Sequence, residues 1–412
     1  MNKGLAAESF LNKLADGSRK NGEIWRPSFT PEYWQARDLV KSLMLENGLE
    51  VREDGVGTLY GTYRGKTDRL VLTGSHLDTV QNGGVYDGAA GVVLPILALG
   101  ELKREGFIPE KNIAVIVMYE EEGSRYPSSY LTSRMITGVM KPVELDERDV
   151  NGISIREAML HDGYDPGALE SAVIHDADAF VELHIEQGPR LENEGLDIGI
   201  VENIVGLYSY EITLRGKQSH AGTTPMRLRR DPVLTAARFV DRITERAGEI
   251  SDTAVITCGA IKSKPQLANV IADHVFFTLD FRDGDDHALM EIDREIEKML
   301  EKCREDGFTV SLVKKCTEKV CHLDAGVART IQDAADSLNL KAVRMNSGAG
   351  HDSQIIAEKI PTAMIFIPSV GGISHSPDEY TRPEDLENGI DIMREVLRKL
   401  ASEEKGKVKN ER

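Results

Sequence analysis

Histidine and carboxylate side chains flank a glycine-rich turn in the first quarter of the sequence. The run GSHLDTV at residues 74–80 is followed by YDGAAG at residues 86–91. Neutral imidazole and carboxylate groups are ligands that divalent metals accept, and Asp78, two residues beyond His76, could brace the histidine ring from behind. A single His-x-Asp pair is more often a strand that ends in a polar turn, so other segments must decide between the two interpretations.

Four further segments carry the same kinds of side chain. They are MYEEEGSR (118–125), ELHIEQG (182–188), SGAGHD (347–352) and GISHSP (372–377). Taken singly, a run of glutamates is normally solvated, and a histidine after an apolar run is normally a core residue. Each of these segments, however, follows a strand-like run and lies beside glycine. Their combination favours a metal-dependent site.

The elements that would position these segments alternate between helix and strand. Helical patterns cover residues 31–47 and 88–103, strand patterns cover 56–64 and 69–74, and a buried-strand pattern covers 112–119. Such alternation predicts an α/β sheet with helices on its faces, where sites form at the carboxyl ends of the strands. His76 and the run Glu120–Glu122 both follow such strands.

From about Tyr208 the order of elements changes to strand, helix, strand, strand, helix, strand. The expected elements are 208–215, 231–247, 253–261, 274–282, 286–303 and 309–315. This βαββαβ order is that of a ferredoxin-like domain. A helix at 327–337 and strands near 341–345 and 362–368 then resume the first pattern. We expect a discontinuous domain of residues 1–207 and 323–412, interrupted by a domain of residues 208–322, and a frayed tail at 403–412.

Composition and charge limit the classes of function. The 412 residues are enough for two domains, and 41% hydrophobic and 29% charged residues are ordinary for a globular protein. A net charge of -18 repels polyanions, so nucleic acid is not an expected partner. The N-terminal residues form no apolar run of signal-peptide length, and no later run approaches a membrane span. We expect a cytoplasmic protein without a membrane partner.

Taken together, the segments resemble the dinuclear-metal amidohydrolases of the M20 metallopeptidase superfamily, specifically its hydantoinase/carbamoylase branch. The resemblance extends from RPSFT at residues 26–30 to the segment around His375. It implies a metal-binding catalytic domain with a central mixed sheet flanked by helices, and an inserted ferredoxin-like lid and dimerisation domain. It also implies two divalent ions per subunit, either zinc or manganese, with cobalt as a further option, because oxygen-rich sites accept several metals.

The resemblance assigns a role to each candidate in the first domain. The metal ligands would be His76 and His184 for one ion, Glu122 and His375 for the other, and Asp87 as the bridge between them. Glu121, directly before a ligand, matches the general base of the family. A pair of divalent ions lowers the pKa of water and polarises a carbonyl group, while a carboxylate that is not a ligand accepts and returns the proton. Gln187 matches a substrate-contacting glutamine, and Gly350 lies in a segment whose backbone lines the family's pocket.

The inserted domain holds a second set of matching residues in the runs SHAGTTPM (219–226), ANV (268–270) and DFR (280–282). His220 resembles an oxyanion-stabilising histidine, which in related homodimers reaches the active site of the neighbouring subunit. Asn269 and Arg282 resemble a pair that grips a substrate carboxylate, a task that suits the bidentate guanidinium group. The structural alternatives are an exposed His220 and an Arg282 paired with Asp280 or Asp283.

The implied reaction is hydrolysis of a carbamoyl or ureido C–N bond in a small carboxylate substrate. Residues 120–127, 179–184 and 364–369 are most similar to allantoate amidohydrolases of purine catabolism, which release ureidoglycine, ammonia and carbon dioxide. N-carbamoyl-L-amino acid hydrolases and β-ureidopropionases share nearly all of the catalytic residues and stay open as alternatives. Asn269 and Arg282 argue against an aminoacylase or exopeptidase. The complete ligand set and Glu121 argue against a non-catalytic metal-binding relative.

Overall fold

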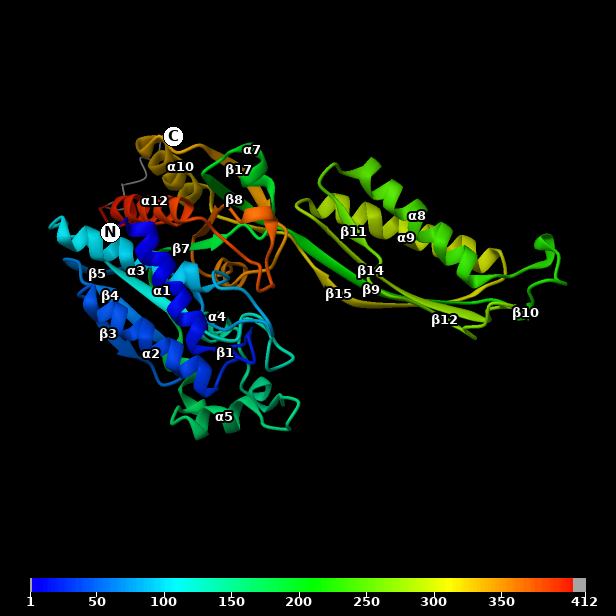
Figure 1. The fold of residues 1–412 in the computed structure, drawn as a ribbon, viewed down its shortest axis with the longest axis horizontal. Helices are drawn as coiled ribbons and strands as arrows, with labels where there is room; N and C mark the ends of the chain where they lie inside the picture. Colours follow the sequence, from blue (N-terminus) through cyan, green and yellow to red (C-terminus); the bar gives the residue numbers. More distant parts are fainter. Residues whose placement is uncertain (1, 403–412) are drawn as a thin grey trace, which may run out of the picture. The chain divides into compact units, whose positions relative to one another are not determined.

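A mixed β-sheet lies at the centre of the first of two units into which the chain divides (Figure 1). The computed structural model describes residues 2–402, so the expected frayed tail at 403–412 lies outside the described residues. The first unit contains the residues up to Glu202, Leu323–Met345 and the residues from His351 onward. The second unit contains Asn203–His322 and also Asn346–Gly350.

Parallel strands form the middle of the first unit's sheet, and antiparallel strands form its edges. The strands are β3 (Glu50–Glu53), β4 (Leu59–Tyr63), β5 (Thr67–His76), β6 (Lys111–Met118), β7 (Ala177–Ile185), β8 (Ile198–Ile204), β17 (Ala342–Ser347) and β18 (Thr362–Ile367). Their order is β8, β18, β7, β5, β6, β4, β3, with β17 also paired to β8. Strands β18, β7, β5 and β6 run parallel, whereas β8, β4 and β3 run antiparallel to their neighbours.

Alternate side chains of the central strands pack on opposite faces of the sheet, as the pleat requires. On β6, Ile113 and Val115 belong to the larger hydrophobic core, whereas Ala114 and Ile116 belong to a smaller one on the other face. The helices that contribute to the larger core include α1 (Lys3–Gly17), α2 (Pro31–Glu46), α3 (Ala89–Arg104), α10 (Ala325–Leu338) and α12 (Pro383–Ser402). Those that contribute to the smaller core are α4 (Leu131–Ile136) and α11 (Asp352–Ile356).

Short elements connect these layers. They are β1 (Arg19–Lys20), β2 (Glu23–Ile24), α5 (Ile155–His161), α6 (Leu169–Ala172), α7 (Arg190–Glu194), and the 3-10 turns η1 (Pro142–Asp146), η2 (Pro166–Ala168) and η4 (Val370–Gly372). Local signals set several helix starts. The Thr30 hydroxyl caps α2 by accepting the Tyr33 N–H, and the Asp324 carboxylate caps α10 in the same way.

The second unit has the ferredoxin-like order. Its elements are β9 (Gly206–Arg215), β10 (Ser219–His220), η3 (Met226–Leu228), α8 (Pro232–Ile250), β11 (Val255–Thr257), β12 (Ile261–Lys264), β13 (Val270–Ile271), β14 (His274–Asp283), α9 (Asp286–Glu305), β15 (Thr309–Glu318) and β16 (Cys321–His322). The antiparallel sheet has the order β11, β14, β9, β15, and α8 and α9 lie on one face of it (Figure 1). Alternate residues of β14, such as Phe277 and Leu279, pack in the core beneath these helices.

One expected strand of the second unit is broken in two. The prediction of a continuous strand at 253–261 is wrong, because β11 ends at Thr257 and β12 begins at Ile261. Thr257 pairs with Asp280 and Ile261 pairs with Phe277. The four residue steps from Thr257 to Ile261 therefore lie opposite only three steps of β14. This mismatch is a β-bulge. The bulge falls at residues 258–260, around Gly259.

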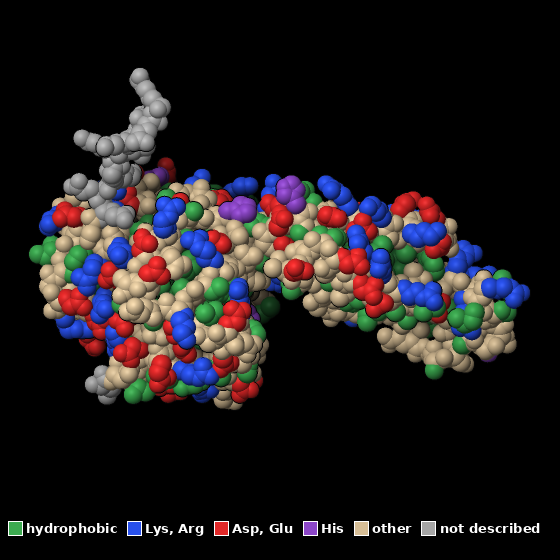
Figure 2. Space-filling model, turned by 90° about the horizontal axis from the view of Figure 1, so that it is seen from above, with side chains coloured by type: hydrophobic (Ala, Val, Ile, Leu, Met, Phe, Trp, Pro, Cys, Tyr) green, Lys and Arg blue, Asp and Glu red, His purple; other side chains and the backbone are tan. Residues whose placement is uncertain are grey.

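The fold class predicted from the sequence is confirmed, with a central mixed sheet flanked by helices and an inserted ferredoxin-like unit. Acidic and basic side chains are interspersed over the face of the molecule in Figure 2. Among residues 2–402, no helix is long and apolar enough to span a lipid bilayer. A cytoplasmic location stays a prediction.

Candidate active site

The carboxyl ends of the parallel strands bring most of the predicted ligands together. His76 is the last residue of β5 and lies opposite Met118, the last residue of β6, so the glutamate run begins beside it. His184 is the next-to-last residue of β7. Asp87 lies two residues before α3, in the glycine-rich turn. This edge is where open α/β sheets bind their ligands.

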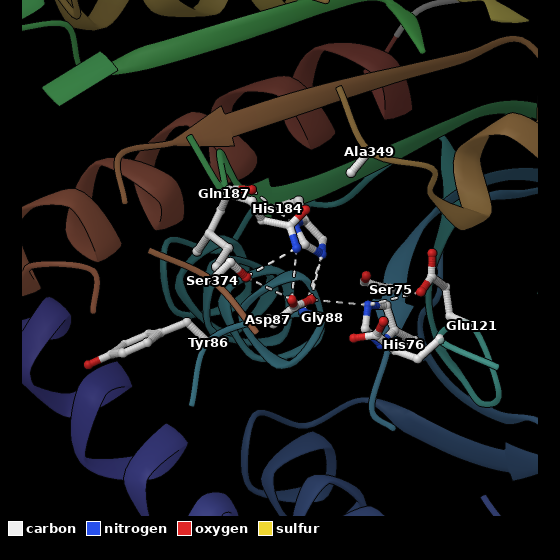
Figure 3. Close-up of polar contacts among 12 residues, drawn as sticks. Ser75, His76, Tyr86, Asp87, Gly88, Glu121, His184, Gln187, Ala349 and Ser374 are labelled. Atoms are coloured by element: carbon white, nitrogen blue, oxygen red, sulfur yellow. Dashed lines mark hydrogen bonds and ion pairs between the residues drawn. The ribbon is translucent and has the colours of Figure 1, made fainter. Parts of the chain in front are cut away.

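Asp87 lies between three histidine rings, two of which are labelled in Figure 3. Its Oδ1 atom is 3.5 Å from His76 Nε2 and 3.3 Å from His184 Nε2. Its Oδ2 atom is 3.2 Å from His375 Nε2, which is also 3.5 Å from Glu122 Oε1. Asp87 therefore belongs to two clusters of potential metal ligands, each with its donor atoms within 4.8 Å of one another.

The two clusters match the two predicted ligand groups. The first contains His76, Asp87 and His184, and the second contains Asp87, Glu122 and His375. Asp87 is the residue common to both, which is the position that a bridging ligand must occupy. The individual ligand roles stay predictions.

Hydrogen bonds orient two of the histidine rings for metal binding. His76 Nδ1 lies 3.0 Å from the Asp78 carbonyl oxygen, and His184 Nδ1 lies 2.9 Å from the Ile185 carbonyl oxygen. A ring that donates from Nδ1 leaves Nε2 unprotonated; in both rings Nε2 faces Asp87, and that of His184 also accepts the Gly88 N–H at 3.3 Å. The close approach of the His76 ring to the main chain beside Asp87 requires glycine at position 88, because a Cβ at Gly88 would lie 2.4 Å from the ring.

The Asp78 carboxylate lies closer to the backbone of the glutamate run than to the His76 ring. It lies 3.7 Å from His76 Nδ1, whereas the Asp78 carbonyl group makes the close contact. The carboxylate accepts the backbone N–H groups of Glu121 and Glu122, both at 3.2 Å. The expected brace of the His76 ring thus comes from the main chain of Asp78, and its side chain holds the two glutamates in place.

The pKa values of the buried groups in the site are shifted from their usual values. Burial, assisted by the nearby Asp87 carboxylate, raises the pKa of Glu122 to about 7. Burial also raises the pKa of Glu121 well above its usual range. The contact with Asp87 raises the pKa of His375 to about 9. The contributions of Asp87 to both the Glu122 and the His375 shifts reflect its negative charge, which bound divalent ions would help to neutralise. The donor set of imidazole and carboxylate groups fits such ions.

Glu121 has the placement expected of a base beside the metals. It is 7% exposed, and its Oε2 atom lies 3.8 Å from His76 Nε2. The preceding residue, Glu120, is fully buried and has a φ of 56°, a conformation that costs free energy in a residue with a side chain. The Glu120 carboxylate accepts the backbone N–H groups of Arg125 at 2.9 Å and Tyr126 at 2.7 Å. Glu120 therefore fixes the turn that carries Glu121.

Gln187 lies against the candidate bridge. Its Nε2 atom donates to Asp87 Oδ2 at 2.8 Å and lies 3.2 Å from Ser374 Oγ (Figure 3). Two polar residues of this network, Ser374 and Glu379, are not assigned by the sequence reasoning. Glu379 accepts the N–H groups of Tyr86 and Asp87 and the hydroxyl of Ser374. Its place four residues after a candidate ligand, in the run SHSPDE, is the signal that could have found it.

His220 and Asn269 lie on neighbouring segments of the second unit. His220 pairs with Val270, and the Ala221 N–H donates to the Asn269 carbonyl at 3.0 Å. His220 is exposed, and its Nδ1 atom accepts the N–H groups of Gly222 at 3.1 Å and Thr223 at 3.2 Å. When Nδ1 accepts, the neutral ring carries its proton on Nε2. That nitrogen is a hydrogen-bond donor, as a group that stabilises an oxyanion must be.

Arg282 lies toward the opposite end of the second unit's sheet from Asn269. Asn269 is in the connection that leads from Lys264 to the start of β14 at His274, whereas Arg282 is near the end of that strand. The eight intervening steps span about 26 Å in an extended strand. Within one chain, Asn269 and Arg282 are therefore separated along the sheet, and their joint grip on a substrate carboxylate stays a prediction.

Arg282 makes the ion pair that was expected as its structural alternative, and it also makes one hydrogen bond to the main chain. Its Nε atom lies 2.9 Å from Asp280 Oδ1, so the ion pair with Asp280 is present. Its Nη1 atom donates to the Gly348 carbonyl at 2.9 Å. Gly350, the predicted pocket-lining glycine, belongs to the same short segment, Asn346–Gly350.

Comparisons with known proteins agree with this arrangement. A model of peptidase family M20/M25/M40 matches residues 72–399. Allantoate amidohydrolase of Bacillus subtilis (strain 168) is 39% identical over 389 residues, which are 93% of this chain and 94% of that protein. N-carbamoyl-L-amino-acid amidohydrolase of Paenarthrobacter aurescens is 35% identical over 399 residues, covering 95% and 97%.

A solved structure is similar over nearly the whole chain. The crystal structure of an amidase of the hydantoinase/carbamoylase family from Burkholderia multivorans has a TM-score of 0.91 and 32% identity, covering 97% of this chain and 98% of that one. The prediction of a metal-dependent hydrolase is confirmed by these relatives. The chain belongs to peptidase family M20/M25/M40 and, within it, to the hydantoinase/carbamoylase amidases.

Proposed function

We propose that this enzyme hydrolyses a carbamoyl or ureido C–N bond of a small carboxylate, with allantoate as the first candidate substrate. The observation that carries the proposal is the pair of ligand clusters that share Asp87, with the buried carboxylate of Glu121 beside them. The similarity to allantoate amidohydrolase, at 39% identity, supports the choice of substrate.

Two divalent ions per subunit are part of this proposal, with zinc or manganese as the favoured metals and cobalt as a further option. His76, Asp87 and His184 would hold one ion, and Asp87, Glu122 and His375 would hold the other. When bound, the ions would lower the pKa of water and polarise the substrate carbonyl group.

The residues around the ligands supply proton transfer and orientation. Glu121 accepts a proton from the attacking water and returns it to the leaving nitrogen as the C–N bond breaks. Burial raises the pKa of Glu121, which makes its carboxylate a better proton acceptor near neutral pH. The Nε2–H group of His220 is suited to the negative charge that develops on the carbonyl oxygen. The products from allantoate would be ureidoglycine, ammonia and carbon dioxide.

A homodimer in which His220 serves the neighbouring subunit is also proposed. Large apolar side chains close to His220 and Asn269 in the sequence are exposed, namely Met226 at 66%, Leu228 at 63% and Leu267 at 59%. Exposed apolar side chains of this kind could be buried by a second chain. The separation of Asn269 from Arg282 supports the same arrangement, since two subunits could supply these residues to one substrate carboxylate.

N-carbamoyl-L-amino acids are the second candidate substrates. The observation in their favour is the relative from Paenarthrobacter aurescens, whose 35% identity extends over 95% of this chain. β-Ureidopropionate stays an alternative on the same chemistry, because it is also a ureido acid.

The experiment that tests the proposal measures ammonia release by enzyme reconstituted with zinc or manganese. The substrates are allantoate, N-carbamoyl-L-amino acids, β-ureidopropionate and an acylated amino acid, with metal-free enzyme as the control. We expect the highest kcat/KM with allantoate. Turnover of a carbamoyl amino acid in preference to allantoate would move the assignment to the second candidate. Hydrolysis of the acylated amino acid alone would contradict the proposed reaction.

A further inference from the structure

A buried glutamate outside the predicted ligand set joins the two loops that carry Asp87 and His375. Glu379 is 4% exposed and lies four residues after His375. Its Oε1 atom accepts the backbone N–H groups of Tyr86 at 2.8 Å and Asp87 at 3.0 Å. Its Oε2 atom accepts the hydroxyl of Ser374 at 2.8 Å. One carboxylate thus holds main chain that is 292 positions away in the sequence.

The same network reaches the side chain of the candidate bridging ligand. Ser374 Oγ lies 3.1 Å from Asp87 Oδ2, and Gln187 Nε2 donates to that oxygen at 2.8 Å. Figure 3 shows Ser374 and Gln187 on one side of Asp87, with His76 on the other. Glu379 therefore holds the main chain of Asp87 directly, and the Gln187 amide, which also lies 3.2 Å from Ser374 Oγ, holds its side chain.

His375 needs such support more than the other histidines do. It has a φ of 53°, a left-handed conformation that costs free energy unless the surroundings fix it. It lies in a loop, and its side chain is 49% exposed. His76 and His184, by contrast, are buried at the ends of β5 and β7, where the strand register holds them. The loop of His375 therefore depends on contacts such as those of Ser374 and Glu379.

Gly84 provides the space that Glu379 occupies. A Cβ added at Gly84 would lie 2.1 Å from both Cδ and Oε1 of Glu379. Atoms that are not bonded to each other do not approach so closely, so the Glu379 carboxylate would have to leave its position. The φ of Gly84 is not in the positive range, so alanine is compatible with the backbone there. The Gly84→Ala substitution is therefore a steric means of displacing Glu379.

We propose that Glu379 is a positioning residue, which sets the separation of Asp87 and His375 and thereby forms the metal site of the Asp87, Glu122 and His375 cluster. Loss of Glu379 should weaken this site more than the site of His76, Asp87 and His184. The inference rests on the proposed function, because it takes these clusters as the places of two divalent ions.

The test is calorimetric titration of zinc, and separately of manganese, into metal-free protein. We expect Glu379→Ala to weaken one of two binding events by about 10- to 100-fold, the usual cost of losing a residue that supports a metal ligand. The other event should change by less than about threefold. Glu379→Gln should retain both events, because its carbonyl oxygen can still accept the two N–H groups and its amide can donate to Ser374 Oγ. Gly84→Ala should reproduce the effect of Glu379→Ala.

Asp54 provides a matched control. Its carboxylate accepts the N–H groups of Val56 at 3.1 Å and Thr58 at 2.9 Å, and the Tyr60 hydroxyl at 3.0 Å, the same pattern of partners as that of Glu379. It lies between β3 and β4 and contacts no candidate ligand through these bonds. Asp54→Ala should therefore leave both metal-binding events unchanged, and circular dichroism of each metal-free variant establishes that it folds.

Several results would overturn the inference. They are unchanged binding of both ions by Glu379→Ala, an equal loss in Glu379→Gln, or the same loss in Asp54→Ala. If Glu379→Ala does not fold, Gly84→Ala and the milder Ser374→Ala carry the test with the same expected selectivity. Wild-type protein that binds only one ion would instead contradict the two-metal proposal, so the two failures are distinguishable.

Discussion

Replacement of Glu121 by glutamine should remove proton transfer and leave the metal site in place. The amide has nearly the shape of the carboxylate, and the hydrogen bonds that the backbone N–H groups of residues 121 and 122 donate to the Asp78 carboxylate do not involve the exchanged atoms. Glu122 should therefore keep its position as a ligand. Glutamine cannot accept the proton, and Glu121 is only 7% exposed, so bulk water is a poor substitute for it. A general base contributes about 10²- to 10⁴-fold to a rate, which corresponds to about 2.7 to 5.4 kcal/mol of barrier.

The assay combines steady-state ammonia release with metal analysis of the same samples. We expect kcat of Glu121→Gln to fall by about 10²- to 10⁴-fold, with the metal content of the wild type. Asp54→Asn serves as the control for a carboxylate exchanged elsewhere in the first unit, and its kcat should stay within about threefold of the wild type. A near-normal kcat in metal-loaded Glu121→Gln would refute the assignment of the base. Loss of metal together with activity would show that Glu121 acts as a ligand instead.

Three further predictions concern the substrate, the dimer and pH. Arg282→Lys should raise KM for carboxylate substrates by about tenfold with little change in kcat, because lysine lacks the bidentate fork, and unchanged kinetics would rule out the carboxylate contact. Mixed dimers of inactive His220→Ala and inactive Glu121→Gln subunits should regain activity, since one site would then contain both native residues; inactive heterodimers would exclude sharing of His220. Burial raises the pKa of Glu122 to about 7, and the contact with Asp87 raises that of His375 to about 9, both above their usual values. Protonation of these groups therefore stabilises the metal-free fold at low pH. This stabilisation is lost as pH rises through about 7 to 9. Metal ions must displace the same protons, so they bind more tightly as pH rises. The increase in Tm caused by zinc should grow between about pH 6 and about pH 8, and an increase independent of pH would contradict this.

Local patterns in the sequence predicted the fold and the strand ends that carry candidate residues, whereas the grouping of the ligands came from the resemblance to a known family. His76, Glu121 and His184 each follow a strand-like run, and the carboxyl ends of parallel strands meet at one edge of a sheet. The order of helices and strands in the second unit was also predicted from the sequence pattern. The break in its second strand was not predicted, because the mostly apolar run at 254–261 does not show where an extra residue is inserted.

The features that escaped prediction depend on pairing between distant segments. Glu379 lies close to His375 in the sequence, but only the fold brings it to the main chain of Asp87. The role of the Asp78 carboxylate was missed for a similar reason, because its partners are backbone N–H groups 43 and 44 positions away.

Anomalous diffraction from crystals grown with zinc can determine whether Asp87 bridges two divalent ions. We expect two metal peaks about 3.5 to 4 Å apart, on either side of the Asp87 carboxylate. One peak should lie beside His76 and His184, and the other beside Glu122 and His375. A single peak, or two peaks that do not share Asp87, would contradict the account.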